Sequence, residues 1–216
     1  MTSSQTLTTL VIFSLLTISY AATDPFKLPT HTSIHFPIRK HQTTLQYYTT
    51  FAAGNPQSPT TVDALIDLGA QPVWFDCTSY ISPSYKRASC GSNRCKKALG
   101  SVCLGCNSTP RPGCSNNTCG VYAYNPIREY LTAQELGEDT IRITSTDGHS
   151  IQLNYNIPKF QFSCADSGIV EGLPGDHTKG LVGLARTHVS LPSQISSAFN
   201  LAKKFALCIP SSSITD

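Results

Sequence analysis

The sequence predicts an all-β, disulfide-rich lobe with one or two short helices. Only 13% of its 216 residues are charged, whereas Ser, Thr, Gly and Pro are abundant and Val and Tyr occur in short runs. This pattern is typical of strands and turns rather than of helices. The hydrophobic share of 40% is enough for one core, so we expect no second complete domain.

The strands are expected in short apolar runs bounded by turn residues. Those before the cysteine-rich loop are Gln46–Phe51, Val62–Asp67 and Pro72–Asp76, with turns at Gly54-Asn55-Pro56 and Leu68–Gln71. Residues His31–Arg39 alternate only weakly between apolar and polar. After the loop, Val121–Tyr124 and Asp139–Thr144 frame an excursion over residues 125–138, which we expect to form a hairpin over a cleft.

The C-terminal part predicts further strands and one helix. A turn at Thr146–His149 precedes a strand at Ile151–Tyr155, Phe160 and Phe162 continue a sheet, and Gly180–Ala185 suits a buried strand. Pro192 marks a first helical turn, because Ile195, Ala198 and Phe199 recur at helical spacing after it. We expect Phe205–Pro210 to return to strand.

The first residues predict export from the cell. An apolar run from Leu10 to Leu16 precedes the small-residue site Ser19-Tyr20-Ala21, so residues 1–21 read as a signal peptide and residues 22–216 as the mature lobe. The apolar run is too short to span a bilayer. We therefore expect a secreted, extracellular protein without a membrane partner.

Nine cysteines in an exported chain predict disulfides. The CxxC at Cys103–Cys106 lacks the second motif that a zinc site needs, and the six His are dispersed, so no metal is expected. The sequence leaves the pairing open. Six cysteines lie in one Gly-, Pro- and Asn-rich loop: Cys90, Cys95, Cys103, Cys106, Cys114 and Cys119. Cys77 and Cys164 lie outside this loop and are also expected in disulfides. Cys208 is expected to be unpaired here.

Other features limit the modifications, partners and cofactors that we expect. Sequons at Asn107 and Asn116 predict glycans on exposed turns of the cysteine-rich loop. The net charge is +3, and no basic cluster is denser than Lys96-Lys97 or Lys203-Lys204, so no nucleic-acid partner is expected. Neither a GxSxG motif nor a P-loop or dinucleotide glycine pattern occurs, so serine catalysis and a cofactor are not expected.

Several motifs in one order resemble a known family. The segments LIDLGAQPVWFDC, RPGCSNNTCGVYAYNP, STDG, FSCA, GLVGLAR, LPSQ and KFALC, within His35 to Pro210, resemble the N-terminal lobe of pepsin-like aspartic peptidases. They are closest to the plant branch of basic 7S globulins, extracellular dermal glycoproteins and inhibitors of xyloglucan-specific endoglucanase and xylanase. The resemblance implies that the chain stops before a C-terminal lobe.

The resemblance also implies that peptidase chemistry is lost. An aspartic peptidase needs two carboxylates that share a proton, each supported by the hydroxyl of the next residue. Asp67 matches the first carboxylate, but Leu68 stands where the family has Thr or Ser, so Asp67 is a vestigial candidate and no catalytic residue is expected. The alternative role for Asp67 is to accept backbone hydrogen bonds at a strand end. Tyr124, followed by Asn125 instead of a flexible Gly, is the candidate residue of a stiffened flap.

A second Asp-Ser-Gly, Asp166–Gly168, is weighed and set aside. It lies 99 positions after Asp67, lacks a preceding apolar strand end and coincides with the FSCA segment, which the family places in a surface connection.

Trp74 is expected in the core.

The resemblance thus implies a binding protein of the extracellular space or cell wall (apoplast), an inhibitor of microbial cell-wall glycoside hydrolases (xyloglucan endoglucanase or xylanase) in plant defence. The alternatives are an aspartic-type endopeptidase, a storage or cell-wall glycoprotein, and a fragment without activity. A lone N-terminal lobe would expose the apolar face that normally packs on its partner lobe, so self-association is also expected.

Overall fold

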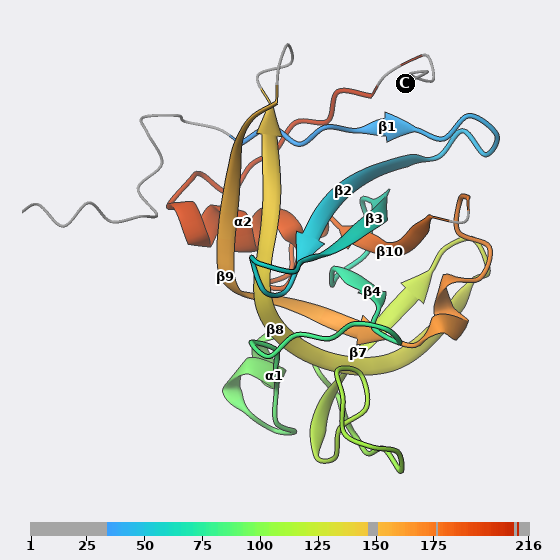
Figure 1. The fold of residues 1–216 in the computed structure, drawn as a ribbon, viewed down its shortest axis with the longest axis vertical. Coiled ribbons are helices and arrows are strands. Elements are labelled where there is room, and N and C mark those ends of the chain that lie inside the picture. Colours follow the sequence, from blue (N-terminus) through green and yellow to red (C-terminus); the bar gives the residue numbers. More distant parts are fainter. Residues whose placement is uncertain (1–33, 147–150, 176, 210, 212–216) are drawn as a thin grey trace, which may run out of the picture.

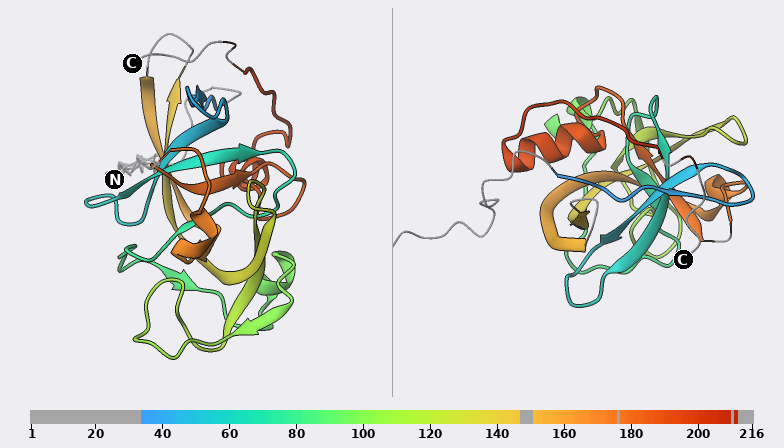
Figure 2. Two further views of the ribbon diagram at one scale, coloured as in Figure 1. Left: turned by 90° about the vertical axis from the view of Figure 1, so that its right-hand side faces the viewer. Right: turned by 90° about the horizontal axis from the view of Figure 1, so that it is seen from above.

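The computed structural model describes residues 34–146, 151–175, 177–209 and 211. The predicted signal peptide and residues 147–149 of a predicted turn lie outside the described residues. Figure 1 shows a mostly β lobe in which the long β8–β9 ribbon curves around the other strands and the disulfide-rich segment projects below. Figure 2 gives two further views of this arrangement. The predicted all-β fold is confirmed.

The ten described strands form one sheet, in the order β1-β2-β3-β10-β4-β9-β8-β7-β6, with β5 paired to β8. The strands are β1 (Arg39–Lys40), β2 (Tyr47–Ala53), β3 (Thr60–Asp67), β4 (Trp74–Asp76), β5 (Lys86–Arg87), β6 (Val102–Leu104), β7 (Thr118–Asn125), β8 (Tyr130–Thr146), β9 (Ile151–Ala165) and β10 (Thr178–Gly183). The helices are α1 (Asn93–Lys97), the 3-10 helix η1 (Ser167–Val170) and α2 (Leu191–Phe199).

Strand β10 lies between β3 and β4 and fixes the position of the loop that joins them. It runs parallel to β3, with Gly183 opposite Asp67, and antiparallel to β4, with Leu181 opposite Trp74. A Cβ on Gly183 would lie 2.4 Å from the carbonyl oxygen of Ala70. Only glycine therefore allows the β3–β4 loop to cross so close to the end of β10.

The main core is aromatic and lies where β4 and β9 meet. The rings of Phe75 and Phe162 stack with their centroids 4.6 Å apart, and the ring of Tyr80 meets Phe75 edge-on. Helix α2 packs against β9 through Gln194, whose amide donates to the carbonyl of Gln161 (2.8 Å) and accepts from its N–H (2.7 Å). The predicted helix is thus joined to the sheet by the Gln of LPSQ.

Two predictions about strands are corrected. Residues 125–138 are no long excursion, because β8 begins at Tyr130 and pairs along β7, which leaves only a four-residue turn at 126–129. No strand forms over residues 205–209. None of the described strands pairs with that segment, and a strand without a neighbour leaves its backbone groups unsatisfied.

Four disulfides close the fold. Cys77–Cys164 joins the end of β4 to β9, and three pairs lie within the cysteine-rich loop: Cys90–Cys103, Cys95–Cys119 and Cys106–Cys114. Cys208 is free and exposed. The pairing holds the short helix α1, which the sequence analysis did not anticipate, against β7 through Cys95.

Candidate binding site around Asp67 and the β7–β8 hairpin

Asp67 ends β3, and its carboxylate shapes the turn that follows. Its Oδ1 accepts hydrogen bonds from the N–H of Gly69 (2.7 Å) and of Ala70 (3.0 Å), while its own carbonyl accepts from the N–H of Leu184 (2.9 Å). One carboxylate oxygen thus satisfies two backbone donors of a tight turn. The hydrogen bonds that the structure gives to the side chain of Asp67 all come from backbone.

Leu68 points away from the core, with 62% of its surface exposed. A leucine side chain has no hydrogen-bonding atoms, so it cannot orient the neighbouring carboxylate as a hydroxyl would. Within the described residues, no second carboxylate is hydrogen-bonded to Asp67. The hydrogen bonds of Asp67 thus support the tight turn that follows β3.

Trp74 connects this turn to the hairpin formed by β7 and β8. Its side chain is fully buried in a cluster with Ala70 from the turn and Ala123 from β7, as expected for a core residue. Its indole Nε1 donates to the backbone carbonyl of Tyr124 at 3.2 Å. The turn and the hairpin therefore share one rigid support.

The hairpin tip is fastened by the buried side chain of Asn125, which is 1% exposed. Its Nδ2 donates to the carbonyls of Ile169 (2.6 Å) and Glu171 (2.9 Å), and its Oδ1 accepts from the N–H groups of Ile127 (2.9 Å) and Arg128 (3.2 Å). An Arg128–Glu171 ion pair of 2.9 Å adds a weaker surface contact. Two of these hydrogen bonds hold the tip against η1 and its end, and the other two fix the turn of the tip itself.

The outer face of this hairpin is apolar and aromatic. Tyr122 and Tyr124 alternate with buried residues along β7, and Leu131 lies directly opposite Tyr124 on β8. Side chains at alternate positions and at paired positions share one face. We call the four exposed side chains of this outer face and of the tip the hairpin face: Tyr122 (48% exposed), Tyr124 (38%), Ile127 (41%) and Leu131 (56%). Tyr130 is also exposed, but it pairs with the buried Asn125 and therefore belongs to the other face of the hairpin.

Asp166–Gly168 forms a second turn, which caps η1. Asp166 Oδ1 accepts from the N–H of Gly168 at 2.8 Å, and its Oδ2 accepts from the side chain of Gln134 at 3.0 Å. Contrary to the prediction, an apolar strand does end just before it, because β9 runs to the buried Ala165. Its carboxylate is held by the cap and by Gln134, so this Asp serves the local structure.

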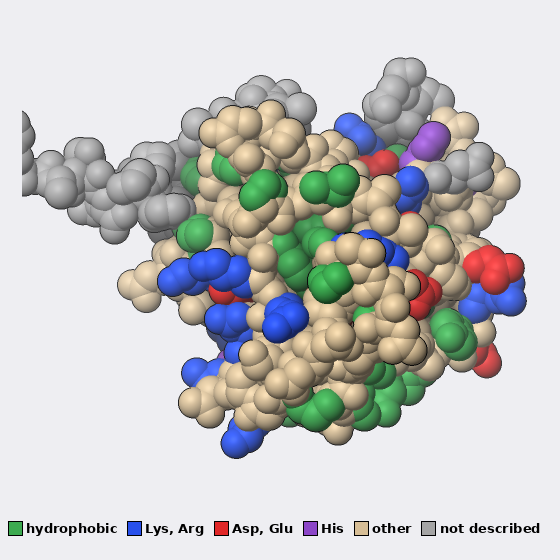
Figure 3. All heavy atoms as spheres, turned by 60° about the horizontal axis from the view of Figure 1, so that its bottom comes forward, with side chains coloured by type: hydrophobic (Ala, Val, Ile, Leu, Met, Phe, Trp, Pro, Cys, Tyr) green, Lys and Arg blue, Asp and Glu red, His purple; other side chains and the backbone are tan. Residues whose placement is uncertain are grey.

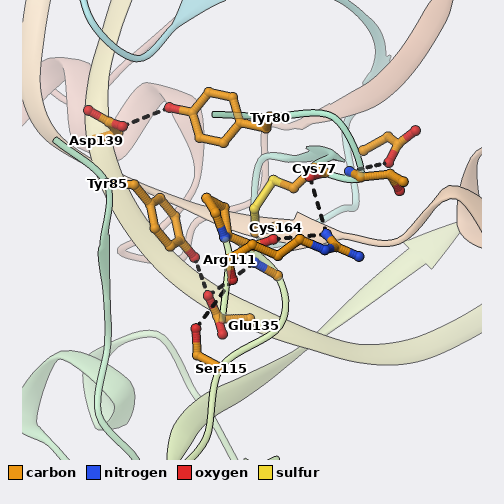
Figure 4. Close-up of a disulfide and its surroundings, with 12 residues drawn as sticks. Cys77, Tyr80, Tyr85, Arg111, Ser115, Glu135, Asp139 and Cys164 are labelled. Carbon is orange, nitrogen blue, oxygen red and sulfur yellow. Dashed lines mark hydrogen bonds between the residues drawn. A yellow bond between two sulfur atoms is a disulfide. The ribbon is translucent and has the colours of Figure 1, made fainter. Parts of the chain in front are cut away.

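A buried polar network beside Cys77–Cys164 was not anticipated from the sequence (Figure 4). The Tyr80 hydroxyl donates to Asp139 at 2.7 Å, and the Tyr85 hydroxyl donates to Glu135 at 2.6 Å. Burial, followed by the interaction with Asp139, raises the pKa of Tyr80 well above its usual range, and burial, followed by the charge of Glu135, does the same for Tyr85. Both phenols therefore remain protonated donors that tie the segment after β4 to β8.

The remaining predicted sites lie apart from the hairpin. Asn107 is exposed, and Asn116 is exposed with its side-chain oxygen accepting from the N–H of Cys106 at 2.8 Å. Cys208 lines an apolar groove of about 570 Å³ between residues 34–38, α2 and residues 201–207. The part of the chain that the structure describes contains no cluster of His, Cys, Asp or Glu able to hold a metal, and none of its helices is long and apolar enough to cross a membrane.

The strand arrangement around β10 and the turn at Asp67 define one lobe of the pepsin-like fold, and solved structures agree. The chain superposes on the crystal structure of edgp with a TM-score of 0.78, at 37% identity over 86% of this chain and 45% of that chain. Basic 7S globulin from soybean gives a TM-score of 0.71, at 35% identity over 79% of this chain and 45% of that chain. The xylanase inhibitor N-terminal model matches residues 47–216, so the chain belongs to that family.

Two relatives of this chain are named for different classes of protein, an aspartic proteinase and a globulin. The chain is 42% identical over 178 residues to the "Probable aspartic proteinase GIP2" of Nicotiana benthamiana, covering 82% of this chain and 40% of that protein. It is 40% identical over 152 residues to "Basic 7S globulin" of Glycine max, covering 68% of this chain and 35% of that protein. The family predicted from the motifs is confirmed, and the chain spans less than half the length of these relatives.

Proposed function

We propose that this chain is a secreted binding lobe without peptidase activity, and that its partner is a glycoside hydrolase that degrades the plant cell wall, a xyloglucan endoglucanase or a xylanase. Membership of the xylanase inhibitor N-terminal family supports this class of partner. Such binding would protect the wall in plant defence. The proposal includes residues 22–216 as the mature N-terminal lobe and the wall space as its location.

The observation that carries the proposal is the state of Asp67. Its Oδ1 is occupied by two backbone N–H groups, and the adjacent side chain is an exposed leucine. A catalytic carboxylate needs a partner with which to share its proton, whereas this one completes a turn. The pepsin-like framework is thereby available as a rigid support for binding.

We propose the hairpin face as the surface that contacts the hydrolase. Protein interfaces are enriched in tyrosine and other aromatic residues, which provide large contact areas at a low cost in conformational entropy. Tyr122 and Tyr124 meet this description, and the Asn125 contacts hold the strand pair beneath them in one position. A surface held rigid before binding loses less entropy when the partner docks.

The test is direct binding to an immobilised xyloglucan endoglucanase and xylanase, together with inhibition of both enzymes. The mature chain should bind at least one of them, and the double variant Tyr122→Ser/Tyr124→Ser should bind at least about ten-fold more weakly, because two interface aromatics each contribute more than about 1 kcal/mol. Ile81→Ser is the matched control, since Ile81 is apolar and 84% exposed outside the hairpin. Equal loss in both variants would contradict the proposed surface.

Two rival functions have support in the names of relatives. "Probable aspartic proteinase" favours peptidase activity, and "Basic 7S globulin" favours a storage role. Proteolysis blocked by pepstatin would establish the first. Folded protein without proteolysis, hydrolase binding or inhibition would favour storage or an inactive fragment.

Self-association is a further part of the proposal. The apolar groove beside α2, lined by Leu184, Leu191 and Leu207 among others, offers an uncovered surface where two copies would reduce exposed apolar area. The mature chain should therefore elute as an oligomer in size-exclusion chromatography with light scattering. A monodisperse monomer that unfolds cooperatively would contradict this expectation.

A further inference from the structure

Charge is divided unevenly along the chain. Between Cys77 and Arg128 there are seven Lys and Arg residues and no Asp or Glu. The rest of the chain holds the other nine Lys and Arg residues and all 13 Asp and Glu residues. The formal charge is therefore +7 in the cysteine-rich segment and −4 in the rest of the chain. The net charge of +3 therefore conceals a strongly basic part of the molecule.

The fold brings two separate basic stretches of this segment together. Lys86 on β5 lies opposite Glu138 on β8 in the backbone register, and the carboxylate of Glu138 forms an ion pair with Arg94 on α1 at 3.2 Å. Strand β5 and helix α1 therefore both adjoin the same position of β8. Adjacency in sequence did not reveal this cluster, because the two stretches are separated by several residues and meet only in the folded chain.

Four side chains of this cluster are exposed, and the structure gives them no anionic partner among the described residues: Lys86, Arg87, Lys96 and Lys97. We call them the basic face. Figure 3 shows Lys and Arg side chains gathered on one side of the surface that carries the disulfide-rich segment. Lys96 and Lys97 lie in the last turn of α1, where positive charges interact favourably with the helix dipole. That interaction does not explain why Lys86 and Arg87, which lie on a strand, are also basic.

The composition of the basic face indicates the class of its ligand. Three of its four cations are lysines, a residue type that is depleted from protein interfaces, and the face contrasts in this respect with the tyrosines of the hairpin face. Mobile, hydrated ammonium groups suit a flexible polyanion that presents many equivalent charges. An exported protein meets such polyanions in acidic polysaccharides.

We propose that the basic face binds a polyuronate, a polysaccharide whose successive sugar rings bear carboxylates. Each ammonium or guanidinium pairs with a carboxylate of the polymer, and the disulfides Cys90–Cys103 and Cys95–Cys119 hold the elements that carry these cations. This contact would keep the protein on the wall matrix. It does not depend on the proposed hydrolase partner, and it uses a different surface.

The test measures binding of the mature chain to polygalacturonate at two salt concentrations. We expect binding in about 0.01 M salt that falls at least about ten-fold in about 0.15 M, because the Debye length shortens from about 30 Å to about 8 Å. Fully methyl-esterified polygalacturonate, which lacks the charge, should not bind. Equal binding to the esterified polymer would overturn the proposal.

Two charge-matched variants locate the contact. Lys86→Gln/Arg87→Gln/Lys96→Gln/Lys97→Gln should lose at least about ten-fold in affinity, whereas a control that removes four exposed cations elsewhere should retain affinity within about two-fold: Lys179→Gln/Arg186→Gln/Lys203→Gln/Lys204→Gln. Circular dichroism and thermal melting confirm that both variants fold. Equal losses in the two variants would show a response to net charge and overturn the site.

Other polyanions test the ligand class. Poly-glutamate and single-stranded DNA present anionic groups on peptide and phosphate backbones, respectively. We expect polygalacturonate to bind at least about ten-fold more tightly than either at equal salt. Equal or tighter binding of poly-glutamate or DNA would overturn the assignment to a polyuronate.

Discussion

The two Asp-X-Gly turns of this chain have the same local geometry in different surroundings. In both, the Asp Oδ1 accepts from the N–H of the glycine two residues later, at 2.7 Å for Asp67 and 2.8 Å for Asp166. Asp67 lies in the loop that crosses β10, whereas Asp166 caps a four-residue 3-10 helix. The Asp166 turn has a hydroxyl residue after the Asp, Ser167, but no loop crosses a strand there. The Asp67 turn leads into the loop that crosses the end of β10, but the residue after its Asp is Leu68, which has no hydroxyl.

This difference shows that topology, rather than the tripeptide, places an aspartate in the pepsin-like position. The parallel pairing of β3 with β10 sets Asp67 opposite Gly183. At Asp166 the chain leaves β9 and turns back toward β10 without such a pairing. Disturbing each turn should therefore have different consequences for the fold.

The largest effect is expected where the loop crosses β10. Gly183→Val would place side-chain atoms against the carbonyl oxygens of Ala70 and Pro72, 2.4 and 2.6 Å from the new Cβ, and should lower the free energy of unfolding by at least about 3 kcal/mol. Chemical denaturation measures this change. Gly69→Ala is the control: its Cβ would meet only Asp67 Oδ1 at 3.5 Å, so a loss similar to that of Gly183→Val would contradict the crossing as the critical point.

A smaller effect is expected at the hairpin tip. Asn125→Ala removes a buried amide and leaves the carbonyls of Ile169 and Glu171 without their donor, so we expect a loss of about 2–3 kcal/mol. Arg128→Ala removes only the exposed ion pair to Glu171 and should cost less than about 1 kcal/mol. Hydrogen exchange should show faster opening of the tip in the first variant alone, and equal exchange in both would refute the role of Asn125.

The two aspartates themselves should rank next. Asp67→Ala leaves the N–H groups of Gly69 and Ala70 without their acceptor and should cost about 2 kcal/mol. Asp166→Ala removes a cap and the contact with Gln134 and should cost about 1 kcal/mol. Asp67→Asn keeps an accepting oxygen, so its melting temperature should lie between those of wild type and Asp67→Ala. A lower melting temperature for Asp67→Asn than for Asp67→Ala would contradict this role and show that the charge matters.

The smallest effect is expected at Leu68. Because 62% of its surface is exposed, Leu68→Thr should change the free energy of unfolding by no more than about 0.5 kcal/mol. We expect no pepstatin-sensitive proteolysis from this variant, since none of the described carboxylates is hydrogen-bonded to Asp67. Thermal melting and an acid proteolysis assay on the same preparation check both statements.

The sequence was sufficient for the fold class, the family and most strands, because alternation, turn residues and ordered motifs are local signals. It misplaced the start of β8, because the polar side chains of Gln134 and Glu135 mask a buried strand that only the β7 and β9 pairings reveal. It also predicted a strand at Phe205, where local hydrophobicity is present but a pairing strand is not. Propensity cannot supply a neighbour.

Near the candidate site, the sequence predicted the strand that ends at Asp67 and the burial of Trp74, because strand signals are local. The anchoring of the hairpin tip by Asn125 was not predicted, since its partners lie more than forty positions away, at Ile169 and Glu171. The basic face was missed because its two short basic stretches, on β5 and α1, meet only in the folded chain. Contacts between distant segments depend on topology, and a single sequence does not encode them in any local pattern.

The most direct test of the central claim is hydrolysis of a denatured protein at acid pH by the mature chain secreted from a eukaryotic host, beside its Asp67→Asn variant. If Asp67 serves only the turn, neither protein releases peptides in a manner that pepstatin blocks. Pepstatin-sensitive cleavage by the wild type that disappears in Asp67→Asn would show that Asp67 is catalytic, and the binding-lobe account would be wrong.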